Sequence, residues 1–293
     1  MKDNKVANIS IRGYSHILGE KECQDNSLSW QEKQYDAVIV CDGHGGDKYF
    51  RSAIGSRFAC EAGKKMISSF MDYVLNNDEM RTSWDTLLSQ LEISIINEWN
   101  ELVKRHFLEN PFESDTRFES LGEDDKMSLR SSYVKAYGST FIAAVLTDKY
   151  LLVLKLGDGN VCVLNGQYKV CLLEKIRREL ADDQLQFNLT TSLCNSDAAK
   201  SFKHCIIPSN KCNKINAVLL SSDGVINSFS TEEAYVAFVE NVFKGFKEQK
   251  LGDAKQELVD FLPELSKKRK WRRLVNRNNC GETKMKMDSL LDL

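Results

Sequence analysis

An apolar run that ends in an acidic, glycine-rich turn constrains the fold of this chain most. Residues 37–41 are Ala-Val-Ile-Val-Cys, which predicts a buried strand, and Asp42-Gly43-His44-Gly45-Gly46 follows directly. Glycine has no Cβ, so the backbone of this turn can approach an ion or a phosphate closely. The Asp42 carboxylate and the Gly43 carbonyl each offer an oxygen to a cation, and His44 lies within reach of whatever the cation activates. The turn therefore predicts a metal site at a sheet edge.

The composition indicates a soluble globular protein of one large domain or two small ones. The chain has 293 residues, 42% of them hydrophobic, and its net charge of −2 excludes a general electrostatic attraction to nucleic acid or membranes. Nine scattered cysteines include no Cys-x-x-Cys pair, which argues against a zinc ribbon or a redox motif. No run of about 18 apolar residues occurs. We expect a cytoplasmic protein in a reducing compartment.

Hydrophobic periodicity predicts an α+β fold, because long helices are grouped apart from runs of strands. A short charged helix or lid is expected at residues 174–187, and a polar surface loop at 110–126. The expected strands are 5–16, 26–30, 36–41, 217–220 and the segments of 140–163, which breaks at 147–149 and 157–159. The expected helices are 54–74, 84–102, one that begins at residue 230, and 253–262.

Three turns in this chain carry an aspartate: Gln24-Asp25, Asp42-Gly43 and Asp223-Gly224. Two of them directly follow apolar strands. Mg²⁺ and Mn²⁺ prefer oxygen ligands, usually several carboxylates and waters. Two such cations bridged by one carboxylate produce a hydroxide-like nucleophile near neutral pH. A single Asp-Gly is a common turn, but three such turns favour a site.

With these motifs in view, the chain resembles the metal-dependent type 2C protein serine/threonine phosphatases, the PPM family. It is most similar to the bacterial branch that has Cys-Gln-Asp in its first motif. Five segments occur in the family's order over roughly residues 8–265. They are Gly13-Tyr14-Ser15-His16 with Cys23-Gln24-Asp25, then 42–46, Gly138-Ser139-Thr140, Gly157-Asp158-Gly159 and Ser221-Ser222-Asp223-Gly224-Val225.

The resemblance implies an αββα sandwich, two antiparallel sheets flanked by helices, with two Mn²⁺ or Mg²⁺ ions at one end. Asp42 would bridge both ions, Asp25 and the Gly43 carbonyl would bind one, and Asp223 the other. His44 would be the general acid that protonates the leaving seryl or threonyl oxygen. The attack on phosphorus would be direct, by metal-activated water, without a phosphoenzyme.

Other residues of the motifs receive more limited roles. Asp158 matches a family acid that can hold a third metal, although Asn227 stands where the family often has a further Asp. For His16, a structural role and a site role both stay open. We expect Cys23 to be a packing residue, because no cationic activator of the thiol is evident in the sequence.

The chain departs from the family pattern at the position that commonly holds the substrate phosphate. Five residues before Asp25, where the family commonly has an arginine, this chain has Glu20. Lys21, Lys48 or Arg51 are the candidates to replace it.

The C-terminus departs further. The family ends with Gly-Asp-Asp or Gly-Asp-Asn, a Ser or Thr and an apolar strand, and its first Asp is a metal ligand. Here residues 269–273 are the basic run Arg-Lys-Trp-Arg-Arg, and Asp288-Ser289 is the only later candidate. We therefore divide the chain into a phosphatase-like domain, 1–266, and an atypical basic tail, 267–293. Two interpretations of this tail stay open: it is disordered, or its basic residues form a cluster that binds nucleic acid.

The genetic code suggests why the tail is atypical. In a reading frame shifted by one base, Trp271 followed by Arg272 encodes Gly. The next two codons can encode Asp-Asp, and those that follow can encode Trp-Ser-Thr-Ala-Ile-Ile. Our hypothesis is that the sequence from about residue 268 onward is frameshifted, and sequencing of the gene tests it.

Two functions of different classes follow from these observations. The first is metal-dependent hydrolysis of phosphoserine and phosphothreonine in proteins, with a substrate made by a cognate serine/threonine kinase and a monomeric enzyme. The alternative is a catalytically impaired pseudophosphatase that binds phosphoproteins. A phosphatase of small phosphate esters also stays open.

Overall fold

The computed structural model describes residues 4–77, 83–174, 191–209 and 214–275, and its strands form two antiparallel sheets packed face to face. The first sheet has the order β1-β2-β3-β4-β7 and the second β6-β5-β8. The strands of the first sheet are β1 (Asn26–Gln31), β2 (Tyr35–Cys41), β3 (Phe141–Thr147), β4 (Tyr150–Leu156) and β7 (Lys203–Pro208). Those of the second are β5 (Asn160–Asn165), β6 (Val170–Leu172) and β8 (Ile215–Ser221).

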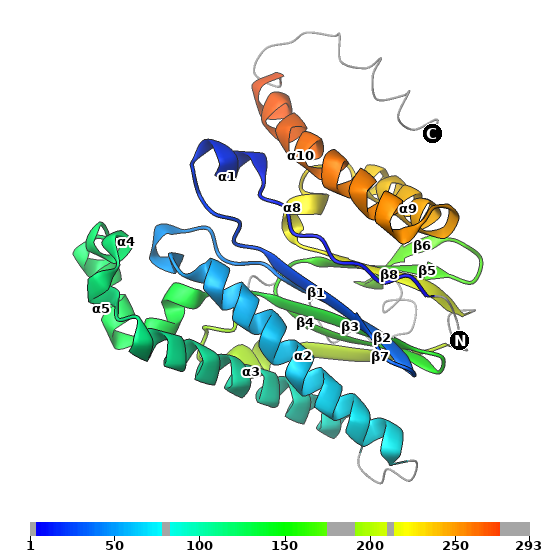
Figure 1. Ribbon diagram of the computed structural model, residues 1–293, viewed down its shortest axis with the longest axis horizontal. Coiled ribbons are helices and arrows are strands. Elements are labelled where there is room, and N and C mark those ends of the chain that lie inside the picture. Colours follow the sequence, from blue (N-terminus) through cyan, green and yellow to red (C-terminus); the bar gives the residue numbers. More distant parts are fainter. Residues whose placement is uncertain (1–3, 78–82, 175–190, 210–213, 276–293) are drawn as a thin grey trace.

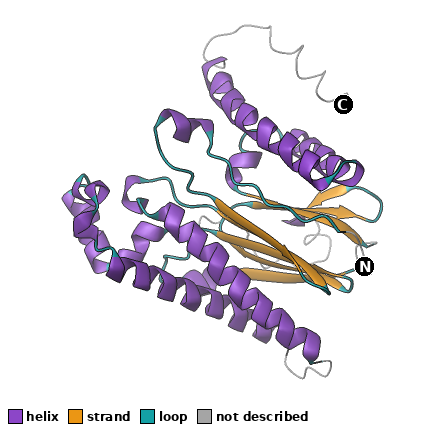
Figure 2. Ribbon diagram, in the orientation of Figure 1, coloured by secondary structure: helices purple, strands orange, loops and turns teal. Residues whose placement is uncertain are grey.

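Helices cover the outer face of each sheet, so the layers run α, β, β, α, as expected (Figures 1 and 2). The long α2 (Ser52–Asn76) and α3 (Trp84–Glu109) lie on the first sheet, and α9 (Glu232–Glu248) and α10 (Leu251–Val275) lie on the second. The shorter helices are α1 (Tyr14–Leu18), α4 (Thr116–Glu119), α5 (Glu123–Ser131), α7 (Ala198–Ser201) and α8 (Asp223–Ile226). None of the helices in the described ranges is long and apolar enough to cross a bilayer.

The alternating side chains of β2 contribute to two separate cores. Ala37, Ile39 and Cys41 are buried against α2 and α3, while Val38 packs into the cluster between the two sheets. This is the period-2 pattern of a strand whose two faces are both covered. The second sheet buries its outer face in a third cluster, which includes Tyr235 and Val239 of α9.

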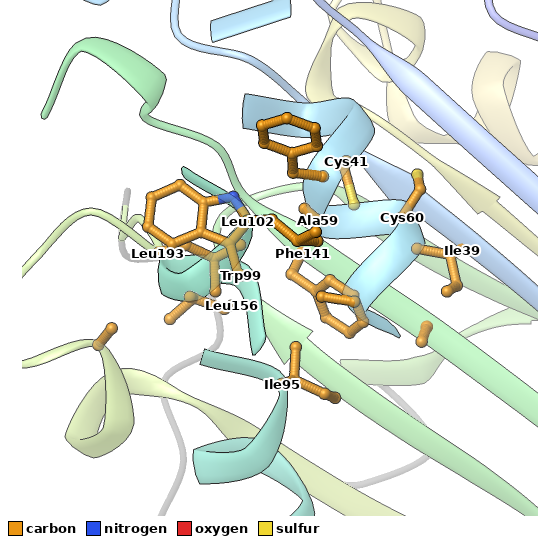
Figure 3. Packing of buried hydrophobic residues seen from close by; sticks show 14 of the residues in the cluster. Ile39, Cys41, Ala59, Cys60, Ile95, Trp99, Leu102, Phe141, Leu156 and Leu193 are labelled. Carbon is orange, nitrogen blue, oxygen red and sulfur yellow. The ribbon is translucent and has the colours of Figure 1, made fainter. Parts of the chain in front are cut away.

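The largest core lies between α2, α3 and the first sheet (Figure 3). Trp99 is fully buried there, and its indole N–H donates to the Gly55 carbonyl at 2.9 Å. Full burial of a large apolar side chain stabilises a fold by about 2–3 kcal/mol. This core therefore makes a rigid platform at the end of β2.

The prediction of a strand over residues 5–16 was wrong. Residues 4–13 contain no strand, and α1 follows them. The segment is attached to β1 by side chains instead. Asn8 Nδ2 donates to the Ser27 carbonyl at 2.9 Å, and the hydroxyls of Ser10 and Ser27 lie 2.8 Å apart.

Two other expectations also differ from the structure. The expected loop 110–126 contains a 3₁₀ turn (Phe112–Ser114), α4 and the start of α5, because Phe112 and Phe118 are buried beside Phe50 and Asp115 caps α4. The last helix is longer than the expected 253–262, since α10 continues to Val275. The strands β6 and β7 were not expected. Most of the expected lid at 174–187 lies outside the described residues.

The contact between α2 and residue 137 predicts the effect of a single methyl group. A Cβ at Gly55 would lie 1.8 Å from the Tyr137 carbonyl oxygen, so Gly55→Ala must displace α2 away from the segment that contains Tyr137. We expect Gly55→Ala to lower the free energy of unfolding by about 3 kcal/mol.

Gly245 in α9 is the matched control, because a Cβ there would meet nothing within 4 Å. Gly245→Ala should raise the free energy of unfolding by about 0.5–1 kcal/mol, the gain in helix propensity. Urea unfolding measures both, and equal stabilities of the two variants would contradict this packing.

Candidate active site

The Asp42 turn is held in place because the pairing of β2 with β3 continues beyond both strands. The Thr140 N–H donates to the Asp42 carbonyl at 2.8 Å, and the Asp42 N–H donates to Thr140 Oγ1 at 2.9 Å. The His44 N–H donates to the Gly138 carbonyl at 3.1 Å, and Gly43 forms a bridge with Ser139. These bonds orient the backbone from residue 42 to residue 44.

A buried amide fixes the same turn from the other side. Gln24 Nε2 donates to the His44 carbonyl at 3.1 Å and to Ser52 Oγ at 2.8 Å, and Ser52 Oγ donates to the His44 carbonyl at 2.9 Å. A Cβ at Gly43 would lie 2.5 Å from the Gln24 carbonyl oxygen, so only glycine fits there. Gln24 therefore connects the first motif to the turn and places the adjacent Asp25.

Four of the predicted acids converge on this turn. The Asp25 carboxyl group forms a hydrogen bond with that of Asp42, and Asp223 interacts electrostatically with both. Asp223 begins α8, where Asn227 Nδ2 donates to its carboxylate at 2.8 Å. Asp158, in the turn between β4 and β5, acts on Asp42 and on His44.

The convergence changes how these carboxyl groups ionise. Burial, followed by the charges of Asp25 and Asp223, raises the pKa of Asp42 to about 9. Burial also raises the pKa of Asp25. Within the described residues, no group of three or more His, Cys, Asp or Glu side chains is close enough to hold a metal ion. The carboxyl groups of Asp25 and Asp42, which contact each other, are thus the two potential metal ligands around which a site would form.

The donor chemistry of this pair fits a hard divalent cation. Two buried carboxyl groups can share a hydrogen bond only when one of them keeps a proton, and a cation between them would replace that proton. Every ligand offered by Asp25, Asp42, Gly43 and Asp223 is an oxygen, as Mg²⁺ and Mn²⁺ prefer. The residues therefore fit the implied ions.

His44 lies at the edge of the carboxyl group cluster, packed against an aromatic ring. Its imidazole meets the Tyr49 ring edge-on, with the ring centroids 4.8 Å apart. A Cβ at Gly138 would lie 2.5 Å from the imidazole, so Gly138 leaves the space that the ring occupies. Burial lowers the pKa of His44, Asp158 acts in the opposite direction and Lys48 adds to the lowering. The ring is therefore neutral at pH 7.

The three candidates to bind the substrate phosphate, Lys21, Lys48 and Arg51, lie in different surroundings. Arg51 is buried, and its guanidinium donates to the Tyr137 hydroxyl at 2.8 Å and the Asn110 carbonyl at 2.6 Å, so it serves the core. Lys21 Nζ lies 3.3 Å from both the Gly45 carbonyl and Asp47, beside the turn. Lys48 is close enough to lower the pKa of His44. Glu20, which occupies the position of the family's arginine, has a left-handed backbone conformation with a φ of 54°.

The remaining motif residues have simpler surroundings. His16 lies near enough to Asp25 to lower the pKa of that carboxyl group. Cys23 Sγ contacts the Asp25 carbonyl at 3.5 Å, and burial raises the pKa of the thiol, which opposes a role as a nucleophile. Sequence reasoning missed the positioning roles of Gln24 and Ser52, because a buried amide and a helical serine carry no chemical signal of their own.

Comparisons with known proteins place this geometry in context. Residues 12–263 match the family model described as protein phosphatase 2C. Among solved structures, a bacterial serine phosphatase has 14% identity, a TM-score of 0.51 and coverage of 88% of this chain and 91% of that chain. This match supports the fold. No curated protein sequence matches the chain.

Two further solved structures are similar at lower scores. The serine/threonine phosphatase Stp1 from Staphylococcus aureus has 17% identity, a TM-score of 0.47 and coverage of 83% and 84% of the two chains. The catalytic domain of the serine threonine protein phosphatase PstP, solved in complex with two manganese ions, has 12% identity, a TM-score of 0.41 and coverage of 83% and 86%.

The raised pKa of Asp42 predicts a pH-dependent cost to stability. In the folded protein its pKa is about 9, far above the value near 4 in the unfolded chain, so the folded state binds one more proton between these pH values. The metal-free protein should therefore lose up to about 4 kcal/mol of stability between about pH 5 and pH 8.

Asp42→Asn removes the titrating group and should flatten this decline, so that the variant is the more stable protein at pH 8. Urea unfolding in EDTA at several pH values measures the slope. If the free energy of unfolding falls equally with pH in the wild type and in Asp42→Asn, the Asp25–Asp42 pair is not the cause of the decline.

Proposed function

Because this chain belongs to the protein phosphatase 2C family, we propose that it hydrolyses phosphoserine and phosphothreonine in proteins with the help of two divalent cations. The observation that carries the proposal is the hydrogen-bonded pair Asp25–Asp42, with Asp223 nearby and His44 at its edge. Buried carboxyl groups with raised pKa values beside an imidazole are typical of catalytic sites. We also assign the chain to the bacterial branch with Cys-Gln-Asp in its first motif, a choice that the buried Gln24 supports.

Asp25, Asp42, the Gly43 carbonyl and Asp223 would hold two Mn²⁺ or Mg²⁺ ions. Asp158 matches the family acid of a third metal site, where Asn227 replaces the further Asp that the family often has. When bound, such ions lower the pKa of water and neutralise charge on the phosphate. The turn residues supply rigidity, since their backbone is bonded to residues 138–140 and to Gln24. Rigid ligands keep their geometry during the reaction, which is the main protein contribution to such a site.

His44 would donate the proton to the leaving seryl or threonyl oxygen. In the free protein its pKa is lowered by burial, so the ring is neutral and has no proton to spare. A bound phosphate dianion would favour the imidazolium by direct charge attraction and give His44 its proton. The edge-on contact with Tyr49 holds the ring in one orientation while its protonation changes.

Lys21 and Lys48 would anchor the phosphate in place of the arginine that Glu20 replaces. Lys21 is tethered to the Gly45 carbonyl, and Lys48 follows the turn by two residues from Gly46. Both ammonium groups lie beside the turn that bears His44. A cation at this position both attracts the phosphorylated substrate and orients its oxygens.

The second candidate function is a pseudophosphatase that binds phosphoproteins without turnover. It is favoured by Glu20 at the position where the family commonly has its phosphate-binding arginine, and by the atypical basic run at residues 269–273. We propose the same division of the chain in either case: a phosphatase-like domain of residues 1–266 and an atypical segment 267–293. A cytoplasmic monomer whose substrate comes from a serine/threonine kinase completes the proposal, supported by the free cysteines of the described part.

Metal-dependent turnover separates the two functions. With Mn²⁺ present, we expect the wild-type chain to hydrolyse an aryl phosphate and a phosphothreonine peptide. Asp42→Ala should abolish the Mn²⁺-dependent rate, and His44→Gln should lower kcat by about 10²–10⁴-fold.

Thermal melting controls for folding and metal binding in the same samples. Mn²⁺ should raise the Tm of the wild type and of His44→Gln but not that of Asp42→Ala. Retention of the phosphopeptide with no difference in turnover between wild type and Asp42→Ala would favour the pseudophosphatase.

The anchoring role predicts a change in KM. Lys21→Met should raise the KM for a phosphopeptide about tenfold and leave kcat within about twofold, because the ammonium group binds the substrate rather than reacting. Lys104→Met, on an exposed position of α3, is the matched control and should change neither constant. Equal KM values for the two variants would argue against Lys21.

A further inference from the structure

A histidine at the edge of the first sheet lies between two carboxylates of the helix that covers it. His204 is on β7, the last strand in the order of that sheet, and α3 packs across the sheet (Figure 1). Its Nδ1 lies 2.9 Å from Glu92 Oε1, and its Nε2 lies 3.1 Å from Asp85 Oδ1. Both acids belong to α3, about two helical turns apart, and therefore share one face of the helix. Each ring nitrogen of His204 thus faces a carboxylate.

This arrangement favours the charged form of the ring. An imidazolium donates from both nitrogens, whereas a neutral imidazole has one N–H and one nitrogen that can only accept. Because a carboxylate also only accepts, a neutral ring would turn a lone pair toward one of the two acids. The hydrogen bond with Glu92 accordingly raises the pKa of His204, Asp85 adds to this effect, and burial of the ring opposes it.

The other titratable side chains of the elements packed around His204 lie elsewhere or are neutral. Successive side chains of a strand alternate between faces, and Leu154, the partner of His204 on β4, is in the core under α3. On the opposite face of the sheet are Lys155, Lys203 and Cys205, at α7 are the exposed Asp197 and Lys200, and on β4 is Tyr150, whose pKa is raised by burial. Among the described residues, the charge of His204 therefore depends chiefly on Asp85 and Glu92.

The two acids differ in their contact with solvent. The side chain of Asp85 is 86% exposed, whereas that of Glu92 is 6% exposed. A buried carboxylate that loses its donor keeps the cost of desolvation, while an exposed one takes a water molecule instead. When the ring loses a proton, the remaining N–H therefore stays on Nδ1, facing Glu92. The proton leaves Nε2 for solvent, and Asp85 loses its donor.

Asp85 belongs to the first turn of α3, where its contact with His204 joins the helix to the sheet. The same turn is also held by Trp84, whose ring meets Tyr150 of β4 edge-on with the ring centroids 5.3 Å apart. Trp84 packs against Phe70 of α2 as well, with the centroids 6.4 Å apart. Of these contacts, only the ion pair depends on the charge of His204.

We propose that Asp85, His204 and Glu92 form a pH-sensitive clamp. The charged ring fastens the first turn of α3 to β7, and the neutral ring releases this turn while it still holds Glu92. Because folding raises the pKa of His204 above the value near 6.5 of the unfolded chain, the clamp contributes fully to stability below about pH 6.5. This contribution is lost as the pH rises through the raised pKa of the folded protein.

Nuclear magnetic resonance of the full chain with isotope-labelled histidine tests the clamp directly. At low pH both nitrogens of His204 should carry protons, and above its titration the N–H should remain on Nδ1. Asp85→Asn changes an exposed side chain, so the variant should fold, and it should lower the pKa of His204 without changing this tautomer. Asp253→Asn, in the first turn of α10, is the matched control and should leave the titration of His204 unchanged.

Hydrogen exchange measures the release of the helix turn. The amides of residues 87–90, compared with those of 99–102 in the same helix, should lose about threefold in protection between about pH 5.5 and pH 8.5. The comparison with 99–102 removes the change in global stability that is expected from Asp42. The relative loss should be absent in Asp85→Asn and should match the wild type in Asp253→Asn.

Three results would overturn the clamp. They are equal titration of His204 in the wild type and in Asp85→Asn, a neutral ring that carries its proton on Nε2, and a relative protection at 87–90 that does not change with pH. These readouts require neither a metal nor phosphate hydrolysis, so they are independent of the proposed function.

Discussion

The structure depends on the pairing of residues 42–44 with residues 138–140. These bonds extend the β2–β3 ladder beyond both strands and carry it into the turn that holds Asp42 and His44. The apolar core under α2 and α3 holds the two strands, and the ladder passes that rigidity to the turn (Figure 3). The glycines at 43 and 138 are required because backbone and imidazole approach closely there. The position of the acidic side chains is thus a consequence of sheet packing.

Concentrating acids at this end of the sandwich has an electrostatic cost. Asp25 and Asp42 share a hydrogen bond, and the raised pKa of Asp42 shows how unfavourable a second negative charge is there. Functional sites commonly keep such destabilising arrangements because the ligand relieves them. His44 is affected in the opposite direction, because burial lowers its pKa and favours the neutral ring. A bound cation would therefore relieve the repulsion between the carboxyl groups at this end of the sandwich.

The sequence predicted the parts of the fold in which one local signal dominates. The run at 37–41, the stripes of α2 and α3 and the acid-bearing turns each have a period or composition that few other structures produce. A strand was expected over residues 5–16, but the polar side chains of residues 4–13 attach this segment to β1 in place of a backbone ladder. The 110–126 segment appears polar, yet Phe112 and Phe118 fold it onto Phe50. Such outcomes depend on tertiary partners that are far away in the chain.

The central claim is that the carboxyl pair at the end of β2 is a site for divalent cations. The most direct measurement is the anomalous difference density of a crystal grown with Mn²⁺. The account predicts a peak between the carboxylates of Asp25 and Asp42, with the Gly43 carbonyl and Asp223 facing it. A structure in which Asp25 and Asp42 remain hydrogen-bonded to each other at saturating Mn²⁺, with no peak beside them, would contradict it.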